Sequence, residues 1–452
     1  MGRIFGTDGA RGVANTEISC TLAMDIARAA AMVVSQKKHK EHPTFLVGSD
    51  TRISRHMLIG AISAGLCSVG ANVITLGVVP TPAVAYLVKE MGADGAVMLS
   101  ASHNSFEFNG IKIFGSDGFK LTDEEEFAIE EIVLDHVLPF DVKWNDHIGT
   151  ITEDFEAVNK YIDHIVATVG GADLSGMKVL VDCANGSASA TAAKMFEKLH
   201  ADVDIINADP NGININDNCG STHIKELGRQ VKEGSYDLGV AFDGDADRCL
   251  AVDCDGNLVD GDQLIAMFAL FLRERGELLN NCAVVTVMSN MGFFRFCKEN
   301  DIKAEITKVG DRYVLENMRE HGYCIGGEQS GHIIFQQHMT TGDGQLTAVQ
   351  LLNLLKVKNL SLKEAASVMQ VYPQVLVNVR ADKEMKKRLN VDEGVQKELK
   401  KWEQILGDNG RILLRPSGTE PLIRVMVEGK DESLINDAAN AIAQSITERL
   451  AY

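Results

Sequence analysis

A strand–helix–strand pattern is readable in residues 44–76, TFLVGSDTRISRHMLIGAISAGLCSVGANVITL. Residues 44–48 form an apolar run of strand length, residues 57–69 have the apolar spacing of a helix, and residues 72–76 form a second apolar run. Another such run lies at residues 96–99. Apolar runs that alternate with helical segments are typical of βαβ units, so we predict a mainly parallel sheet covered by helices.

The alternation continues along most of the chain. Further predicted strands lie at residues 178–182, 204–207, 238–242 and 284–288, and further predicted helices at residues 189–199, 263–273 and 312–321. The end differs, with predicted strands at 374–380, 411–414 and 422–427 and predicted helices at 393–406 and 432–450. The last helix carries one apolar stripe, which is typical of an amphipathic helix packed on a small sheet.

These patterns predict an α/β fold of four domains, in which three similar mixed α/β sandwich domains precede a smaller α+β domain. A length of 452 residues suits three or four domains at roughly 100–200 residues each. Turn residues and polar stretches place the predicted domains at residues 1–150, 151–256, 257–372 and 373–452.

The composition excludes several classes of protein. Hydrophobic residues make up 45% of the chain, which is ample for large cores and argues against disorder. The formal net charge of −19 argues against a protein that coats nucleic acid. We see no apolar core of a signal peptide and no apolar run long enough to cross a membrane. Nine scattered cysteines without a CxxC pair indicate free thiols rather than a zinc site, so we expect a cytoplasmic protein.

A serine-containing segment follows the predicted strand at residues 96–99. It reads Ser100-Ala101-Ser102-His103-Asn104. The carboxyl ends of strands in α/β sheets are where ligands usually bind, so Ser102 is a candidate nucleophile. On its own, the segment fits a simple turn better.

An acidic segment, Asp243-Gly244-Asp245-Ala246-Asp247-Arg248, follows the predicted strand at residues 238–242. Three carboxylates together are unfavourable unless a cation lies among them. An EF-hand is excluded, because Arg248 stands where that loop needs Gly and Cys254 where it needs Glu. Few protein ligands around a hard cation indicate Mg²⁺, and a solvated acidic turn is the alternative.

Three other motifs could bind a polar ligand. The segment 415–421, RPSGTEP, with Arg424 beyond it, offers guanidinium, hydroxyl and backbone donors to a phosphate. The segment 326–332, GGEQSGH, sets Glu328 and Ser330 between glycines, where they could bind sugar hydroxyls. The segment 5–12, FGTDGARG, sets Arg11 among glycines, and Lys112 follows the serine segment. Structural turns and an ordinary surface lysine are the alternatives, and the chain has no Walker A sequence.

In their order along the chain, these motifs resemble those of the α-D-phosphohexomutase family, from Phe5 to about Val427. Residues 209–216 (DPNGININ), 219–223 (CGSTH) and 326–332 are most similar to the branch that acts on glucosamine phosphates. The resemblance implies a phosphorylated Ser102 and Mg²⁺ bound by Ser102, Asp243, Asp245 and Asp247. It implies catalytic roles for Ser102, Lys112, Arg11, His103 and His332, with Lys112 as the candidate general base. It implies substrate contacts from Glu328, Ser330, Arg415, Ser417, Gly418, Thr419 and Arg424.

The implied activity is isomerisation of glucosamine 6-phosphate and glucosamine 1-phosphate, on the route to UDP-N-acetylglucosamine. Phosphoserine 102 would donate its phosphoryl group to the sugar, and a 1,6-bisphosphate would turn round in one central cleft that the four domains share. Glucosamine 1,6-bisphosphate or a similar hexose bisphosphate would act as activator. The partner would be a small amino-sugar phosphate, with no nucleic acid and no membrane, and a homodimer is left open. The alternatives are a mutase for glucose or mannose phosphates, a phosphoserine-dependent sugar phosphatase, and a sensor without catalysis.

One departure from the family pattern concerns the loop that carries the serine. Members usually have proline after the Ser-His-Asn triplet, whereas this chain has Ser105. Proline fixes φ and would stiffen the loop. The departure therefore puts the rigidity of the loop in doubt, but not the presence of the nucleophile.

Overall fold

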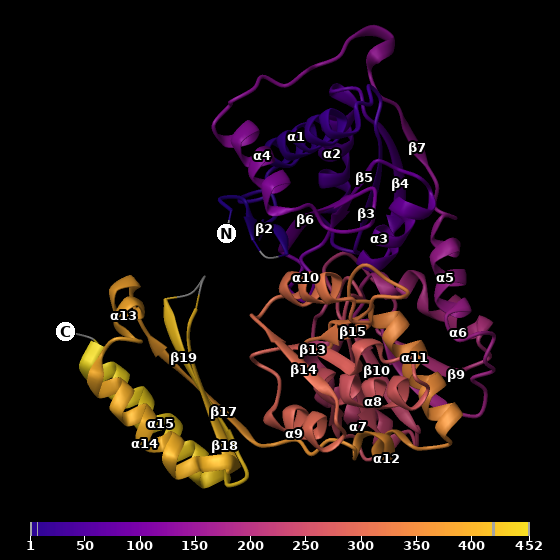
Figure 1. The fold of residues 1–452 in the computed structure, drawn as a ribbon. Helices are drawn as coiled ribbons and strands as arrows, with labels where there is room; N and C mark the ends of the chain where they lie inside the picture. The colour runs from indigo at the N-terminus through magenta and orange to yellow at the C-terminus, as the bar shows by residue number, and fades with distance from the viewer. Residues whose placement is uncertain (1, 7, 418–420, 451–452) are drawn as a thin grey trace. The chain divides into compact units, whose positions relative to one another are not determined.

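The computed structural model describes residues 2–6, 8–417 and 421–450. The chain divides into two compact units, of which the first comprises Met1–Met288 and Ile302–Val368 and the second Ser289–Asp301 and Met369–Tyr452. Three α/β sheets lie in the first unit and a small antiparallel sheet lies in the second (Figure 1). The predicted fold class is therefore confirmed. Within the described residues, no helix combines the length and the apolar character that crossing a membrane would require.

The first sheet has seven strands in the order β1-β2-β6-β5-β3-β4-β7. Strands β3, β4, β5 and β7 run parallel, and β6, β2 and β1 complete the sheet in antiparallel fashion. The strands are β1 (Phe5–Gly6), β2 (Gly9–Val13), β3 (Thr44–Ser49), β4 (Asn72–Val78), β5 (Gly95–Leu99), β6 (Phe108–Gly115) and β7 (Ile151–Glu153). The helices of this region are α1 (Cys20–Lys38), α2 (Arg55–Ser68), α3 (Thr81–Glu90) and α4 (Asp123–Leu134).

The sequence analysis left out several elements of this region, namely helices α1, α3 and α4 and strands β1, β2, β6 and β7, of which helix α1 is the longest. It packs against α2 and α4 (Figure 1). Its buried face consists largely of alanines, including Ala23, Ala27 and Ala30, with only Ile26 and Val34 as larger apolar residues, so its apolar stripe is weak. The Ser19 side chain caps the helix by accepting a hydrogen bond from the Leu22 amide, which is a common N-terminal signal.

The second sheet has five strands in the order β12-β11-β10-β8-β9. Its strands are β8 (Lys178–Asp182), β9 (Asp202–Ile206), β10 (Leu238–Phe242), β11 (Cys249–Asp253) and β12 (Leu258–Val259), with helices α5 (Val158–Ala167), α6 (Ala192–Lys198) and α7 (Ile224–Glu233). The predicted helix at residues 189–199 is broken, because Thr191 has a non-helical φ of −128°. The Thr191 hydroxyl donates to Gln345 Oε1 at 2.9 Å, a tertiary contact that the local sequence does not reveal.

The third sheet has four strands in the order β14-β13-β15-β16. Its strands are β13 (Cys282–Thr286), β14 (Lys303–Thr307), β15 (Ile325–Gly327) and β16 (Ile333–Phe335), with helices α8 (Gly261–Glu274), α10 (Asp311–His321), α11 (Gly344–Lys358) and α12 (Leu362–Ala366). Helix α11 also packs against β10 and β11, so the second and third sheets share part of their cover. Together the three sheets bring several strand ends and loops of the first unit to one place.

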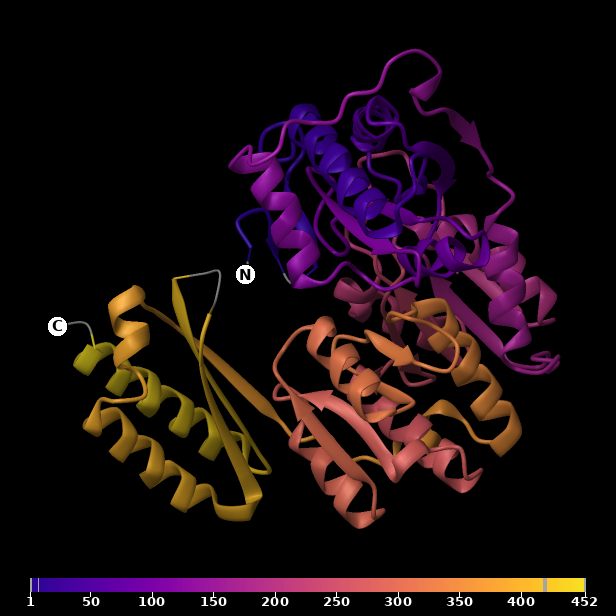
Figure 2. The same ribbon diagram turned by 45° about the horizontal axis from the view of Figure 1, so that its top comes forward.

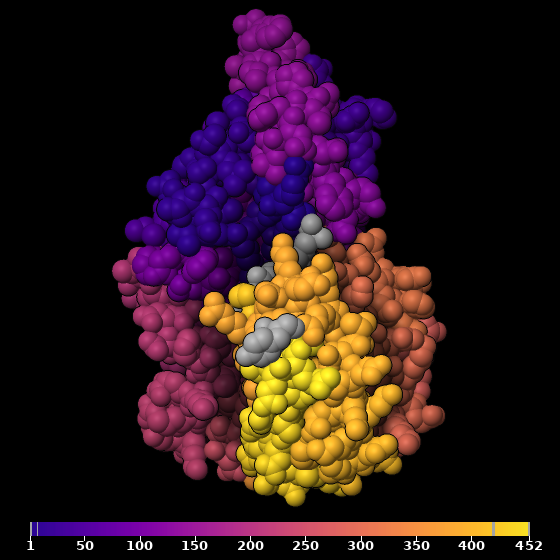
Figure 3. Space-filling model, turned by 90° about the vertical axis from the view of Figure 1, so that its left-hand side faces the viewer, coloured from indigo at the N-terminus to yellow at the C-terminus, as the bar shows by residue number. Residues whose placement is uncertain are grey.

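The second unit is built around a three-stranded antiparallel sheet in the order β17-β19-β18. Its elements are α9 (Met291–Glu299), β17 (Gln374–Arg380), α13 (Lys383–Arg388), α14 (Glu393–Leu406), β18 (Gly410–Pro416), β19 (Leu422–Gly429) and α15 (Glu432–Leu450). Helices α14 and α15 lie side by side on one face of the sheet (Figures 1 and 2). Figure 3 looks onto these two helices from outside. The predicted apolar stripe of α15 is buried, as Ile435, Ile442 and Ile446 show.

Candidate active site

Ser102 lies in the loop that follows the buried strand β5. Its φ of 50° is in the left-handed region, which a residue other than glycine adopts at some cost and which often marks a functional position. Its hydroxyl donates to Asp243 Oδ2 at 2.6 Å, so the serine loop and the aspartate loop meet. Gly244 permits this approach, because a Cβ there would lie 2.5 Å from the Ser102 carbonyl oxygen.

A buried arginine that sequence analysis missed holds the serine loop. Arg52 is fully buried, and its Nε donates to Asp50 Oδ2 at 2.8 Å. Its Nη2 donates to the carbonyl oxygens of Ser102 at 3.0 Å and Asn104 at 2.8 Å, and its Nη1 donates to those of Ser105 and Phe108. Arg52 therefore supplies the rigidity that the missing proline put in doubt.

Two further contacts fix Ser102 from either side. The Ser102 amide donates to Ser100 Oγ at 2.9 Å, and Ser100 Oγ in turn donates to Asp50 Oδ2 at 2.6 Å. Asn216, in the 209–216 segment, donates through Nδ2 to the carbonyls of Ser102 and Asn104, both at 2.9 Å. The segment that marked the glucosamine branch thus touches the nucleophile loop.

The three aspartates of the metal motif converge, as their spacing predicted. Asp243, Asp245 and Asp247 are all buried, and one carboxylate oxygen from each lies within 4.8 Å of the others. Burial, together with the charges of Asp247 and Asp245, holds the pKa of Asp243 well above its usual range. Asp245 Oδ1 and Asp247 Oδ1 are buried and have no hydrogen-bond partner among the described residues. Three converging carboxylates, two of which keep a buried oxygen without a hydrogen bond, fit a hard cation such as Mg²⁺.

Lys112 projects from β6 into this acidic cluster and is fully buried. Its Nζ lies 2.8 Å from Asp245 Oδ2, 3.0 Å from Asp8 Oδ2 and 3.6 Å from Asp247 Oδ2. Burial disfavours the charge, but Asp245 and Asp8 outweigh it and raise the pKa of Lys112. In this arrangement Lys112 is an ammonium, the form that neutralises a phosphoryl group and donates a proton.

Two arginines face the same cluster. Arg11, on β2, pairs with Asp8, and Arg248 follows the last aspartate. The Nε atoms of both are buried without a hydrogen-bond partner among the described residues. Such groups are suited to phosphate oxygens. Arg248 was absent from the predicted site, although a cation directly after three aspartates was a signal that could have found it.

His103 lies next to the candidate nucleophile. One ring nitrogen, Nδ1, is 3.3 Å from Ser102 Oγ. Burial, followed by the charges of Arg248 and Arg11, lowers the pKa of His103 to about 4. The ring is therefore neutral at physiological pH, so it can accept a proton or a hydrogen bond beside Ser102.

The predicted sugar loop lies against the aspartate loop. Gly331 accepts a hydrogen bond from the Cys249 amide at 3.0 Å, and His332 Nδ1 lies 3.6 Å from Asp247 Oδ2. Glu328 Oε1 accepts from the Gly310 amide at 3.0 Å, which fixes its carboxylate. The Ser330 hydroxyl oxygen is buried and unpaired among the described residues, so a ligand hydroxyl could complete it.

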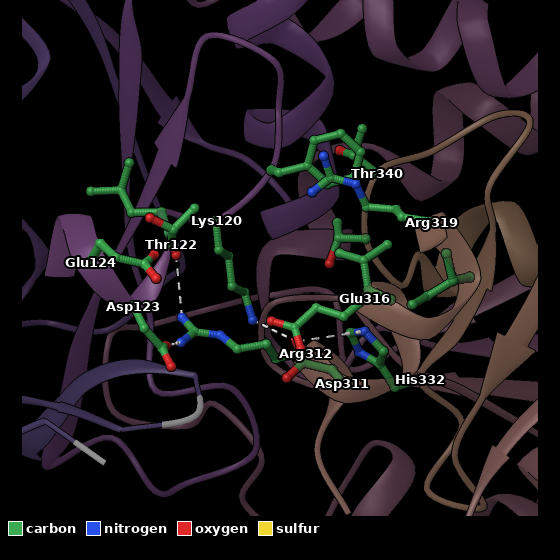
Figure 4. A pocket seen from close by; sticks show the side chains of 15 residues that line it. Lys120, Thr122, Asp123, Glu124, Asp311, Arg312, Glu316, Arg319, His332 and Thr340 are labelled. Carbon is green, nitrogen blue, oxygen red and sulfur yellow. Dashed lines mark hydrogen bonds and ion pairs between the residues drawn. The ribbon is translucent and has the colours of Figure 1, made fainter. Parts of the chain in front are cut away.

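A cavity of about 230 Å³ adjoins His332 (Figure 4). Lys120, Asp311, Arg312 and Arg319 line it together with His332. Lys120 Nζ lies 2.6 Å from Asp311 Oδ2 and also pairs with Asp8. Neither Lys120, Asp311 nor Asp8 was among the predicted site residues.

The phosphate motif lies in the second unit. Arg415, on β18, and Arg424, on β19, are direct partners across the antiparallel pair. Two guanidinium groups at neighbouring positions of the sheet are suited to bind one phosphate. The Ser417 amide donates to the Leu422 carbonyl at 2.8 Å. Gly418 and Thr419 lie outside the described residues.

The first unit thus brings together Ser102, His103, Lys112, Arg11, Asp243, Asp245, Asp247, Glu328, Ser330 and His332. Their individual roles remain predictions, as do the domain boundaries. Strand β7, at residues 151–153, adds to the first sheet, and residues 289–301 join the second unit.

Curated proteins resemble this chain over its whole length. It is 52% identical over 451 residues to the phosphoglucosamine mutase of Acetivibrio thermocellus and 48% identical over 452 residues to that of Brevibacillus brevis, covering 100% of both chains in each case.

Solved structures share the fold. A phosphoglucomutase/phosphomannomutase family protein from Burkholderia thailandensis superposes with a TM-score of 0.82 at 22% identity, covering 98% of this chain and 97% of that one. The N-acetylphosphoglucosamine mutase of Aspergillus fumigatus, in complex with GlcNAc-6P and magnesium, superposes with a TM-score of 0.69 at 19% identity, covering 98% and 95%.

Four segments match the four domains of one family. Residues 2–137, 159–256 and 260–372 match the alpha/beta/alpha domains I, II and III of phosphoglucomutase/phosphomannomutase, and residues 376–445 match its C-terminal domain. These matches cover most of the chain and agree with the three α/β sheets and the small antiparallel sheet. The chain belongs to the phosphoglucomutase/phosphomannomutase family.

Proposed function

We propose that the chain interconverts glucosamine 6-phosphate and glucosamine 1-phosphate through a phosphorylated Ser102. The observation that carries this proposal is the position of Ser102. Its hydroxyl lies 2.6 Å from one of three buried aspartates, in a strained loop that Arg52 holds in place. The nucleophile lies beside two arginines and three aspartates that could bind a metal ion. This arrangement suits phosphoryl transfer, in which positioning and charge neutralisation dominate.

The choice of substrate rests on the relatives. Full-length relatives at 52% and 48% identity are named phosphoglucosamine mutase. Solved relatives bind GlcNAc-6P with magnesium, and glucose 1,6-bisphosphate in the case of a serine-to-alanine variant. We therefore favour an amino-sugar phosphate as substrate and a hexose 1,6-bisphosphate as the activator that charges Ser102. Nine free cysteines suit a reducing cytoplasm.

The transfer can be written with the groups of the first unit. A sugar hydroxyl attacks the phosphorus on Ser102, the bond between phosphorus and Oγ breaks, and the hydroxyl loses its proton. His103, whose lowered pKa keeps its ring neutral, would accept that proton and return it to the Ser102 Oγ that leaves. The raised pKa of Lys112 suits it to neutralise phosphoryl oxygens as an ammonium, rather than to act as the general base that the resemblance implied. Arg11 and Arg248 would bind phosphoryl oxygens through their unpaired Nε atoms. Mg²⁺ held by Ser102, Asp243, Asp245 and Asp247 would supply further charge neutralisation.

The remaining residues would hold the sugar. Glu328 and Ser330 would bind its hydroxyl groups, with His332 beside them. Arg415, Ser417, Gly418, Thr419 and Arg424 would bind the phosphate that is not reacting. If so, Arg415→Ala and Arg424→Ala should raise KM for glucosamine 6-phosphate by roughly 10–100-fold, since a charged hydrogen bond contributes about 1.5–3 kcal/mol. Unchanged kinetics in both variants would contradict this role.

Transfer of a labelled phosphoryl group tests the activity directly. The protein is charged on Ser102 with ³²P and mixed with glucosamine 6-phosphate, glucose 6-phosphate or mannose 6-phosphate. We expect label to enter glucosamine 1,6-bisphosphate fastest, because a held hydroxyl competes well against free water. Faster labelling of glucose or mannose bisphosphate would show that the substrate is a hexose phosphate rather than glucosamine phosphate. Label released mainly as inorganic phosphate would identify a phosphatase instead.

A further inference from the structure

A ring of charged and polar side chains adjoins Ser102 in the first unit, in which His332 takes part as an imidazole whose Nε2 accepts a hydrogen bond from the Gly342 amide at 3.1 Å. Its members, which we call the charge ring, are Lys112, Asp8, Lys120, Asp311, His332 and Asp247. Lys112 contacts Asp8 at 3.0 Å and Asp247 at 3.6 Å, and His332 lies 3.6 Å from Asp247 and 3.9 Å from Asp311. Lys120 closes the ring by pairing with Asp8 on one side and with Asp311, at 2.6 Å, on the other.

The ring joins segments that are far apart in sequence. Asp8 precedes β2, Lys112 lies on β6, Asp247 follows β10, Asp311 begins α10, and His332 precedes β16. Lys120 and Asp311 are 191 residues apart, so their pair ties the first sheet region to the third. Asp8 is the centre of the arrangement, because Lys112, Lys120 and Arg11 all pair with this one carboxylate.

The outer side of the ring borders a cavity rather than a packed core. Lys120, Asp311 and His332 line the cavity of about 230 Å³, as Figure 4 shows. The Lys120 and Asp311 side chains are 13% and 16% exposed, whereas the Lys112 side chain is 0% exposed. Ion pairs of Lys120 with Asp8 and with Asp311 hold these two side chains on the inner side.

We propose that Lys120 and Asp311 are positioning residues for phosphoryl transfer. They hold Asp8 in place, and Asp8 in turn holds the Lys112 ammonium and the Arg11 guanidinium beside Ser102 and the aspartates. Neither Lys120 nor Asp311 needs to touch the substrate for this effect. The inference rests on the proposed function, since it explains how the reacting groups are aligned.

A second set of ion pairs in the same region provides a control. It helps to hold the same two regions together but does not contact Asp8, so its loss reports a purely structural effect. Arg312, the neighbour of Asp311, pairs with Asp123 and with Glu126, the latter at 3.0 Å. It links the same two regions, and among the described residues its ion pairs are with Asp123 and Glu126 rather than with a member of the charge ring. Arg319, also on α10 and in the cavity wall, has its guanidinium 3.8 Å from the centre of the Phe119 ring. These two arginines provide matched controls.

The test compares steady-state kinetics of Lys120→Met, Asp311→Asn and their double variant with the intact chain. Misplacing a reacting group by about 1 Å can cost on the order of 100-fold in rate. We therefore expect kcat to fall by roughly 10–100-fold in each single variant, with KM for glucosamine 6-phosphate changing less than about threefold. Because both residues act through one chain of contacts, the double variant should be no worse than the poorer single variant.

Control variants and a rescue variant distinguish a positioning role of Lys120 and Asp311 from a general loss of structure. Arg319→Met and Arg312→Met should keep kcat within about threefold of the intact chain, and Lys120→Arg should recover most of the activity that Lys120→Met loses. A normal kcat in Lys120→Met, or an equal loss in Arg312→Met and Arg319→Met, would overturn the proposal. Should Lys120→Met not fold, Asp311→Asn and Lys120→Arg carry the same comparison.

The outcome is separable from that of the proposed function. If the intact chain turns over glucose or mannose phosphates instead, the substrate assignment fails, and the same variants are measured on the substrate that is used. The positioning proposal then stands or falls on the kcat ratio between variant and intact chain. A rate loss confined to the ring variants would support it on any hexose phosphate.

Discussion

The serine loop (residues 100–105) and the aspartate loop (residues 243–248) are built alike but stabilised differently. Each follows a fully buried strand, β5 or β10, and each contains a residue other than glycine with positive φ, 50° at Ser102 and 58° at Ala246. The buried Arg52 donates to three backbone carbonyl groups of the serine loop and to that of Phe108, at the start of β6. In the aspartate loop, three carboxylates are buried together and two of their oxygens lack a partner among the described residues.

This difference indicates which loop is complete without a ligand. The protein itself satisfies the polar groups of the serine loop, so that loop should keep its shape in the free protein. The aspartate loop has ion pairs with Lys112 and Arg248, but it keeps two buried carboxylate oxygens that accept no hydrogen bond among the described residues, and a bound cation would complete it. A substitution in the first loop should therefore act on chemistry or folding, and one in the second on ion dependence.

The largest effect is expected from Ser102→Ala. A methyl group cannot carry a phosphoryl group, so isomerisation of glucosamine 6-phosphate should fall below detection. The melting temperature should stay near that of the intact chain, because the contacts of Arg52 to this loop use backbone carbonyls that alanine retains. An isomerisation assay and thermal melting check both points. Substantial turnover by this variant would remove Ser102 from the mechanism.

The next effect concerns Asp243→Asn, which keeps the shape of the side chain but cannot become the carboxylate that would bind Mg²⁺. Without added Mg²⁺ the variant should be about as stable as the intact chain, because burial and the other two aspartates already raise the pKa of Asp243 and favour its neutral form. The intact chain should gain about 2.7 kcal/mol in unfolding free energy at a Mg²⁺ concentration 100 times its Kd, and the variant should gain much less. Denaturant unfolding with and without Mg²⁺ measures this. Equal gains in both proteins would contradict the metal assignment.

A smaller effect on activity but a large one on folding is expected from Arg52→Met. Removing one partner of a buried ion pair leaves Asp50 uncompensated and should cost about 3–5 kcal/mol of unfolding free energy. Arg229→Met is the matched control, since the partners of Arg229, Glu226 and Glu233, are at the exposed surface. That control should lose less than about 1 kcal/mol. A similar loss in both variants would show that Arg52 is not the organiser of the serine loop.

The same contrast explains what could be predicted from sequence. The strands before both loops are short apolar runs, and Ser102 and the three aspartates stand directly after them, so local pattern was sufficient to find them. Asp8, Lys120 and Asp311 have no such signal, and Arg52, although it follows the predicted strand at residues 44–48, shows no motif that marks it. Each is a single charged residue in a polar segment, and its importance arises from partners up to 191 residues away. Helix α1 was missed for a different reason, because its buried alanines do not form a conspicuous apolar stripe.

The smallest effect is expected from Ser105→Pro, which restores the residue that family members usually have. The Ser105 carbonyl accepts from Arg52 and, at 3.2 Å, from the Phe108 amide, and proline keeps that carbonyl. If Arg52 already fixes the loop, the added stiffness should change the unfolding free energy by no more than about 1 kcal/mol, mainly through the unfolded chain. Turnover should stay within about threefold of the intact chain.

A more sensitive test combines Ser105→Pro with Arg52→Met, because the serine loop then lacks the hydrogen bonds that Arg52 donates. There proline should restore part of the lost turnover, measured by the same isomerisation assay. A large gain from Ser105→Pro in the otherwise intact chain would show that the serine loop is mobile despite Arg52, and the contrast between the two loops would then fail.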